Sequence, residues 1–235
     1  TLIFHEKTDA FTVNIGLSSD EKYYFITSSD HNTSEQYYFD INEKNPTPKL
    51  IQKRERGVLY SVNSWNGYFY MHTNKNAEDF KIDVCNNLEK QDWKIFIPAK
   101  NEVLIGGLTF LKNWIIRSET SNALDKLFVQ NISTNIEEEL IFSDENIYVP
   151  GVSLTQKNRN TNEVYLGYSS PKTPSRVYKY NLLNKSKELV KEQEIPSGHN
   201  KDDYIVERVE FKSHDGRMVP LTITRHKKTK IDGSA

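Results

Sequence analysis

The sequence has 235 residues and a mass of 27.4 kDa, enough for one large domain or two small ones with a real core. Its 31 Lys and Arg nearly balance its 32 Asp and Glu, so it lacks the basic excess of proteins that bind nucleic acid or an anionic membrane. No run approaches the roughly 18 apolar residues of a membrane-spanning helix. Cys85 is the single cysteine and cannot form an internal disulfide, which favours a reducing, cytoplasmic location.

The chain opens with Thr1-Leu2-Ile3-Phe4-His5, which is neither an initiator Met nor a signal peptide with an apolar core. We expect residues 1–6 to be a strand left over from a preceding repeat. The sequence is therefore expected to be a fragment of a longer protein.

Short runs rich in Tyr, Phe, Val and Ile dominate the following residues, and Asn, Asp, Ser, Gly and Pro separate them. The best helix candidate, residues 182–190, reads better as a turn that leads into a strand. The sequence therefore predicts a mostly β protein. Its clearest strands are expected at residues 11–16, 23–27, 36–41, 58–62, 68–73, 114–117, 126–132, 164–168 and 176–181.

These runs recur with a period. Strands with a bulky centre begin at Tyr24, Tyr68, Trp114 and Val164, roughly 44 to 50 residues apart, the length of a four-stranded propeller blade. Each follows a first strand (11–16, 58–62, 103–108, 149–154) and precedes a third (37–40, 80–83, 127–129, 177–180). A more polar fourth strand, at 49–52, 93–97, 138–142 and 188–191, fits an exposed outer edge. The pattern predicts an all-β partial β-propeller of about four four-stranded blades; an irregular β-sandwich is the alternative.

The strand repeat ends near residue 200. Residues 204–213 alternate as a strand, Asp215-Gly216 supplies a tight turn, and residues 218–225 return as the partner strand. These strands are longer than the blade strands and fall outside the repeat. We therefore predict a propeller at 1–201 and the opening hairpin of a second, truncated domain at 202–235.

The sequence contains no complete catalytic site. Ser153 lies in Gly-Val-Ser-Leu-Thr (151–155), the nearest approach to Gly-x-Ser-x-Gly, but a threonine replaces the second glycine and no helix follows. Cys85 lies in an alternating run and is expected to fill a buried or half-buried position. We predict no catalytic residue in this sequence.

Metal and cofactor sites are not expected either, because the histidines lack the spacing of metal ligands and read as isolated surface or loop residues. The acidic runs 137–139 and 202–203 lie in polar stretches and are expected to be solvated. The histidines are His5, His31, His72, His199, His214 and His226.

Residues 207–220 (Glu-Arg-Val-Glu-Phe-Lys-Ser-His-Asp-Gly-Arg-Met-Val-Pro) resemble the entry into the hydrolase domain of the prolyl oligopeptidase family of serine peptidases. Residues 167–180 are similar to the Tyr-Ser-Ser…Thr-Pro segment of that family's last blades. Thr33-Ser34-Glu35, followed by Tyr37–Asp40, resembles the oligopeptidase B (protease II) branch.

The resemblance implies a seven-bladed propeller that restricts access to short peptides, joined to an α/β-hydrolase domain with a Ser-Asp-His triad. On that plan the sequence holds the later blades and the first hairpin of the hydrolase domain. The triad, the oxyanion donors and the acidic pocket for Arg or Lys side chains belong to a missing segment, so the fragment is expected to be inactive. The intact protein is expected to be a cytoplasmic oligopeptidase that cleaves short peptides after Arg or Lys; a non-catalytic propeller scaffold is the alternative.

Arg208 is the one predicted substrate contact, because it lies at the junction of the two domains, where its cation is placed to meet a substrate carboxylate or carbonyl. The alternative is a surface arginine neutralised by Glu207 or Glu210. The remaining partner expected is a second copy of the fragment, because a cut propeller leaves open sheet edges that pair between molecules.

Overall fold

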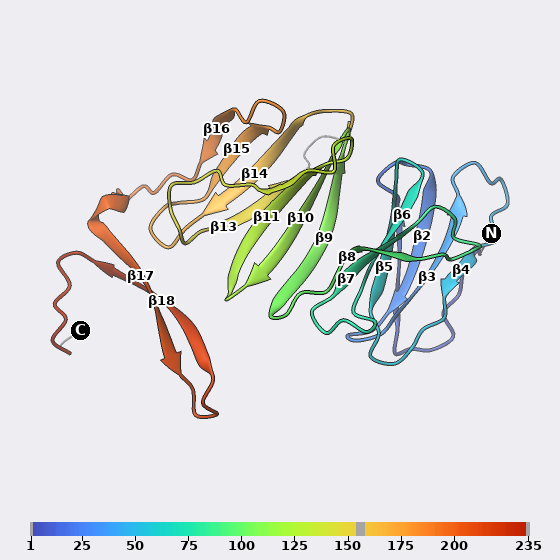
Figure 1. Cartoon of the computed structure of the whole chain (residues 1–235), viewed down its shortest axis with the longest axis horizontal. Coiled ribbons are helices and arrows are strands. Elements are labelled where there is room, and N and C mark those ends of the chain that lie inside the picture. The colour runs from blue at the N-terminus through green and yellow to red at the C-terminus, as the bar shows by residue number, and fades with distance from the viewer. Residues whose placement is uncertain (1, 154–157, 234–235) are drawn as a thin grey trace. The chain divides into compact units, whose positions relative to one another are not determined.

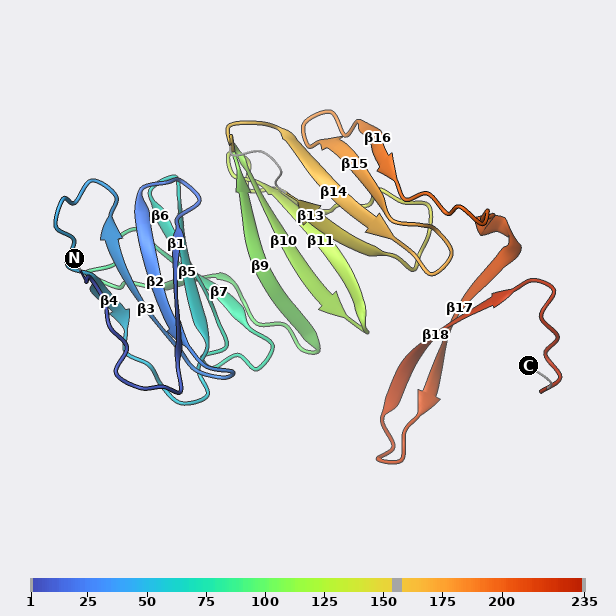
Figure 2. The same cartoon turned by 180° about the vertical axis from the view of Figure 1, so that it is seen from behind.

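The computed structural model describes residues 2–153 and 158–233. Its strands form four four-stranded antiparallel sheets and one hairpin, with the strands of each sheet in chain order (Figures 1 and 2). The first two sheets are β1 (Thr12–Leu17), β2 (Tyr23–Ser29), β3 (Ser34–Asp40), β4 (Lys49–Gln52), and β5 (Tyr60–Trp65), β6 (Tyr68–Thr73), β7 (Lys81–Cys85), β8 (Lys94–Ile97). The next two are β9 (Val103–Leu111), β10 (Trp114–Ser121), β11 (Leu124–Asn131), β12 (Glu137–Glu139), and β13 (Val149–Ser153), β14 (Glu163–Ser169), β15 (Arg176–Asn181), β16 (Lys187–Glu192). The hairpin is β17 (Tyr204–Lys212) and β18 (Met218–His226), preceded by the short 3₁₀ turn η1 (Lys201–Asp203).

This architecture confirms the all-β class and the four-stranded blades of a partial propeller. The predicted strands agree with the observed ones to within a few residues, and three of them, 49–52, 68–73 and 176–181, coincide. Leu154, at the end of the predicted strand 149–154, lies outside the described residues.

Three details of the strand prediction were wrong. Residues 2–6 form no strand and are held instead through the side chains of Phe4 and Glu6. Phe80 lies before β7, where its backbone has φ +66° and its ring stacks on His72. In the predicted outer strand 138–142, pairing ends at Glu139, and Leu140 and Phe142 turn into the core.

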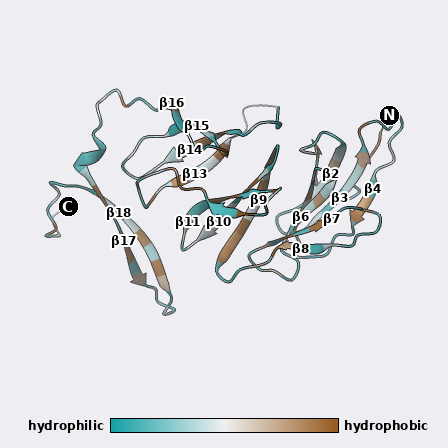
Figure 3. Ribbon diagram, turned by 45° about the horizontal axis from the view of Figure 1, so that its top comes forward, coloured by the Kyte–Doolittle hydropathy of each residue, from teal (hydrophilic) through white to brown (hydrophobic). Residues whose placement is uncertain are grey.

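The chain divides into two compact units, residues 1–107 and 108–235, each with its own apolar core. The blade strands carry the apolar residues and the outer strand β16 is polar (Figure 3). The first core consists of Phe25, Ile51, Tyr60, Val62, Phe69, Met71, Cys85 and Leu88. The second consists of Leu111, Trp114, Ile116, Leu127, Val129, Leu140, Phe142, Val164, Leu166, Tyr168, Tyr180 and Leu182.

A network of charges in the first unit fastens the leading segment to its blade. Arg54 Nη2 donates to Glu6 Oε2 at 2.6 Å and to Glu35 Oε1 at 3.0 Å, and Ser28 Oγ donates to Glu6 Oε2 at 2.6 Å. The pKa of Glu6 falls to about 2, first through the Ser28 hydrogen bond and then through Arg54. The side-chain contacts of Glu6 therefore hold the leading segment on its blade, in place of the backbone hydrogen bonds that a paired strand would form.

A second network lies within the blade β9–β12. Arg117 on β10 donates to Glu119 at 2.9 Å and to Glu137 on β12 at 2.5 and 3.0 Å, and its guanidinium lies 5.0 Å from the Phe128 ring centroid. The Arg117 side chain is only 3% exposed. A buried cation needs such partners, since an unpaired charge in the interior is strongly unfavourable.

The hairpin presents two chemically different faces. Its antiparallel register pairs Val209 with Leu221 and Phe211 with Val219, so these four side chains share one face with Ile223. All five are 40 to 61% exposed. The opposite face carries Val206, Arg208 and Thr222. The hairpin turn contains Gly216 at φ +86°, a conformation that favours glycine.

Candidate functional site

Arg208 lies on β17, on the face of the hairpin opposite to the exposed apolar one. Its Nη1 donates to Thr222 Oγ1 on β18 at 3.1 Å, and its Nη2 donates to the carbonyl oxygen of Asn122 in the β10–β11 turn. Its Nε is buried and has no acceptor among the described residues. The guanidinium therefore connects the hairpin to a blade turn and keeps one donor unused.

Beside Arg208 is a cavity of about 510 Å³. Three blade segments and the hairpin contribute to it: the start of β11, the segment between β12 and β13, the β14–β15 turn, and β17. The lining residues are Leu124, Asp144, Glu145, Asn146, Ile147, Lys172, Val206 and Arg208. The lining residues are spread over a span of about 85 positions in the sequence. Neither the period of the strands nor the spacing of motifs indicates that they lie together.

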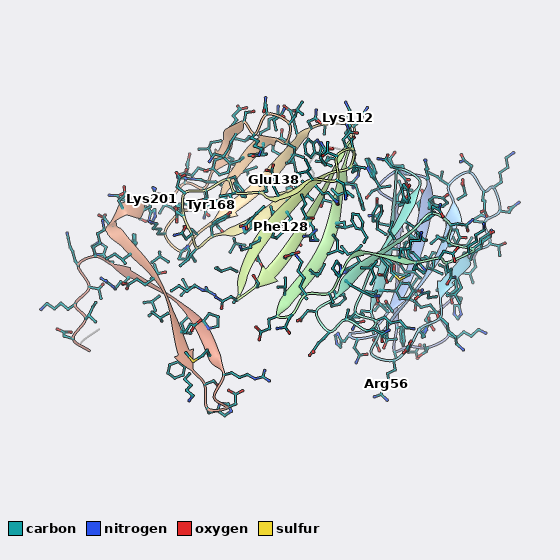
Figure 4. The ribbon with its side chains drawn as sticks, in the orientation of Figure 1. Arg56, Lys112, Phe128, Glu138, Tyr168 and Lys201 are labelled. Carbon is teal, nitrogen blue, oxygen red and sulfur yellow. The ribbon has the colours of Figure 1, made fainter. Side chains whose placement is uncertain are left out.

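Glu145 anchors the wall of this cavity. Its Oε1 accepts from Thr173 Oγ1 at 2.5 Å and its Oε2 from Ser170 Oγ at 2.7 Å. Burial by itself raises the pKa of Glu145, but these hydrogen bonds, together with Tyr168 (labelled in Figure 4) and the charge of Lys172, outweigh it and leave the pKa below its usual value. Glu145 is therefore an ionised carboxylate that holds the β14–β15 turn in place.

The linker before the hairpin contacts the same turn. His199 Nε2 donates to the Lys172 carbonyl oxygen at 2.7 Å, and the His199 ring stacks on Tyr204 at 5.3 Å. Tyr204 in turn meets His226 edge to face at 5.6 Å. These contacts fix the main chain of Lys172 and leave its side chain at the cavity.

The other residues weighed from the sequence lie away from this cavity. Cys85 is buried, as expected, and burial raises the pKa of its thiol, which disfavours the reactive thiolate. Ser153 is an exposed residue at the end of β13, while Leu154 and Thr155 of its motif lie outside the described residues. Within the described part of the chain no three His, Cys, Asp or Glu residues gather as a metal site.

One expectation about polar residues is corrected. His72 is neither a surface nor a loop residue: it lies on β6, donates through Nε2 to the Ile105 carbonyl at 2.7 Å, and has a pKa lowered by burial. In the acidic run 137–139, Glu137 and Glu138 are exposed, as expected, and ion pairs form as well: Glu137 contacts Arg117, Glu138 contacts Lys185 and Glu139 contacts Lys126. Asp202 and Asp203 are exposed, as expected.

Lys172 and Glu145 are the residues of the cavity that sequence reasoning missed. Lys172 stands inside the Tyr-Ser-Ser…Thr-Pro segment, whose hydroxyls at Ser170 and Thr173 bind Glu145. Closely spaced hydroxyls are common in turns, so the sequence shows neither that these two bind a carboxylate nor which of the 32 acidic residues it is.

The comparisons with known proteins decide the family. Residues 1–193 match the family model described as "Prolyl oligopeptidase, N-terminal beta-propeller domain". The chain belongs to the prolyl oligopeptidase family. It covers the propeller domain of that family, whose members are serine peptidases. The family resemblance, which residues 167–180 carry within the matched range, is thereby confirmed.

Curated relatives match across nearly the whole chain. Dipeptidyl aminopeptidase BI of Pseudoxanthomonas mexicana is 26% identical over 238 residues, which cover 100% of this chain and 32% of that protein. Protease 2 of Moraxella lacunata is 27% identical over 233 residues, covering 94% of this chain and 31% of that protein. The chain therefore spans about a third of the length of these relatives.

Solved structures agree in fold. Oligopeptidase B from Trypanosoma brucei, in its closed form with covalently bound antipain, matches with a TM-score of 0.89 at 24% identity over 97% of this chain and 34% of that one. Oligopeptidase B from Leishmania major matches with a TM-score of 0.88 at 19% identity over 98% of this chain and 34% of that one.

Proposed function

We propose that this chain is the access-restricting propeller part of a serine oligopeptidase that hydrolyses short peptides after Arg or Lys. The match of residues 1–193 to the family's propeller domain carries the proposal. The relative named protease 2 and the fold match to oligopeptidase B support this branch of the family over the others. Such a propeller acts by exclusion, because a flexible peptide enters a narrow opening that a folded protein cannot.

The exposed apolar face of the hairpin favours a further layer of structure that packs against it. A sheet face carrying Val209, Phe211, Val219, Leu221 and Ile223 is the kind that proteins bury against another layer. We propose that its partner is the protein's own hydrolase domain, which supplies the triad and the acidic pocket for a basic side chain. The propeller part alone is then inactive. We also propose a cytoplasmic location and Arg208 as a substrate contact.

The test uses the full-length protein and a fluorogenic peptide series that differs only at the residue before the scissile bond: Arg, Lys, Pro or Ala. We expect cleavage after Arg and Lys, at least tenfold slower turnover after Pro and Ala, and complete loss on treatment with a serine-directed inhibitor. Residues 1–235 alone should give no turnover. Preferential cleavage after Pro would reject the assigned specificity, and an inhibitor-insensitive protein would favour a non-catalytic binding scaffold.

Isolated from its partners, the 235-residue chain should also self-associate. The outer strand β16 and the inner strand β1 are exposed throughout, and the apolar hairpin face is uncovered. Sedimentation velocity at rising concentration should show increasing mass, and Phe211→Lys should reduce the effect. A monomer at all concentrations would contradict this expectation.

A further inference from the structure

His72, which the proposed function does not use, holds the beginning of β9 to the sheet β5–β8. Its Nε2 donates to the Ile105 carbonyl oxygen at 2.7 Å, and the Ile105 N–H donates to the Asp79 carbonyl oxygen at 2.9 Å. All three residues belong to the first compact unit. β9 is the end strand of its own sheet, so one of its edges has no neighbouring strand. At the fully buried Ile105, these two bonds satisfy the backbone groups instead.

Phe80 completes this contact. Its ring stacks on the His72 ring, with 4.5 Å between the centroids and 16° between the planes. Its φ of +66° lies in the left-handed region, which is unfavourable for a bulky side chain and persists only where the surrounding structure holds it. Residues strained in this way gather at segments that switch between two states. The contact therefore joins a histidine to a strained backbone.

The surroundings of His72 favour its neutral form. Burial lowers the pKa of His72 more than the hydrogen bond to the Ile105 carbonyl raises it. Since histidine ordinarily titrates near 6.5, the ring is uncharged at neutral pH. Below that value a ring released into water takes up a proton more readily than the bound ring does, so acid favours release.

No opposite charge compensates a proton on the bound ring: among the described residues, no carboxylate contributes to the pKa shift of His72. On β7 the residue paired with His72 is Ile82. Its neighbours Lys81 and Asp83 therefore point to the opposite face of the sheet, where they pair with each other at 2.9 Å. The strand β5 carries no Asp, Glu, Lys or Arg. The other charged residues of the adjoining segments are Lys75, Glu78 and Asp79 before β7, and Lys100 and Glu102 before β9.

We propose that the bond from His72 to Ile105 is an acid-sensitive latch, which holds the open edge of β9 when the ring is neutral and releases it when the ring is protonated. As the charged ring moves out to water, the Ile105 carbonyl loses its donor and Phe80 loses the ring stacked on it. The Ile105 N–H keeps its bond to Asp79. The propeller is therefore tighter at neutral than at mildly acidic pH. The latch is a property of the blades and is independent of the peptidase function.

The test measures amide hydrogen exchange in residues 103–107 of the full-length protein by mass spectrometry, at pH 7.5 and at pH 5.5. The rates are corrected for the pH dependence of the exchange chemistry itself. At pH 5.5, one unit below the ordinary pKa of histidine, about ten of every eleven released rings are protonated, so release becomes about tenfold more favourable. We therefore expect the protection of this segment to fall about tenfold between the two pH values.

Three variants separate the latch from other effects of acid. His72→Gln keeps a side-chain N–H donor but does not titrate, so the protection should differ by less than about twofold between the two pH values. His72→Phe lacks the donor and should be weakly protected at both. His31→Gln removes an exposed histidine from the β2–β3 turn and should behave as the unmodified protein.

Equal protection at both pH values in the unmodified protein would overturn the latch. A pH dependence that persists in His72→Gln would overturn it too, because another group would then be responsible. Peptide cleavage is not measured in this experiment, so neither result bears on the proposed function, which the peptide series tests separately.

Discussion

Two arginines in the second unit show opposite ways of placing a cation. Arg117, inside the blade β9–β12, is 3% exposed and has Glu119 and Glu137 as partners and Phe128 beneath its guanidinium. Arg208, at the hairpin, is half-buried and, among the described residues, donates to two neutral oxygens and has no acceptor for Nε. The partners of Arg117 hold its blade together, whereas the contacts of Arg208 join the hairpin to a blade turn and leave one buried donor without an acceptor among the described residues.

The largest expected effect is from removing the saturated cation. Arg117→Ala removes the cation that pairs with the buried Glu119 and with Glu137, so the free energy of unfolding should fall by about 3–5 kcal/mol. Urea denaturation followed by tryptophan fluorescence measures it, because Trp114 lies in the same blade. Arg56→Ala, at an exposed loop residue (Figure 4), is the control and should change the unfolding free energy by less than about 0.5 kcal/mol. Equal effects of the two variants would contradict the structural role of the buried, ion-paired Arg117.

A smaller effect is expected at the charge network of the first unit. Because the folded-state pKa of Glu6 is depressed to about 2 from 4.5, its contribution to stability is present above pH 4.5 and is lost as the pH falls from 4.5 towards 2. Glu6→Gln should cost about 2 kcal/mol at pH 7 and should reduce the loss of stability through that acid range. Urea midpoints at several pH values measure both; an unchanged acid dependence would show that Glu6 is not held as described.

The smallest expected effect on stability is at Arg208. Its bonds to Thr222 and to the Asn122 carbonyl are exposed, so Arg208→Met should lower the unfolding free energy by less than about 1 kcal/mol, measured by urea denaturation. A loss as large as that of Arg117→Ala would mean that Arg208, too, mainly supports the fold.

Much of the fold could be predicted because each blade repeats the same order of four strand types. Aromatic and branched residues at the same step of a period of about 44 to 50 residues gave the strand order of all four sheets. The prediction failed at residues 2–6, which side-chain contacts such as that of Glu6 with Arg54 hold in place of strand pairing, and at Phe80, which has a positive φ and a ring stacked on His72. Such contacts join residues far apart in sequence and have no period.

The candidate site was less predictable for the same reason. Arg208 was singled out by its place at the junction, but Lys172 lies in the β14–β15 turn, which Glu145 and His199 hold through contacts distant in sequence. The cavity is lined by segments that only the folded chain brings together, so composition and motif spacing do not identify its lining residues.

The central claim is that these blades restrict a serine peptidase to short peptides. The direct measurement presents one Arg-containing sequence to the full-length protein in two settings, as a free peptide of about ten residues and within an exposed loop of a stable folded protein. We predict cleavage of the free peptide, inhibited by a serine-directed reagent, and no cleavage of the folded protein. Cleavage of both at similar rates would contradict the claim.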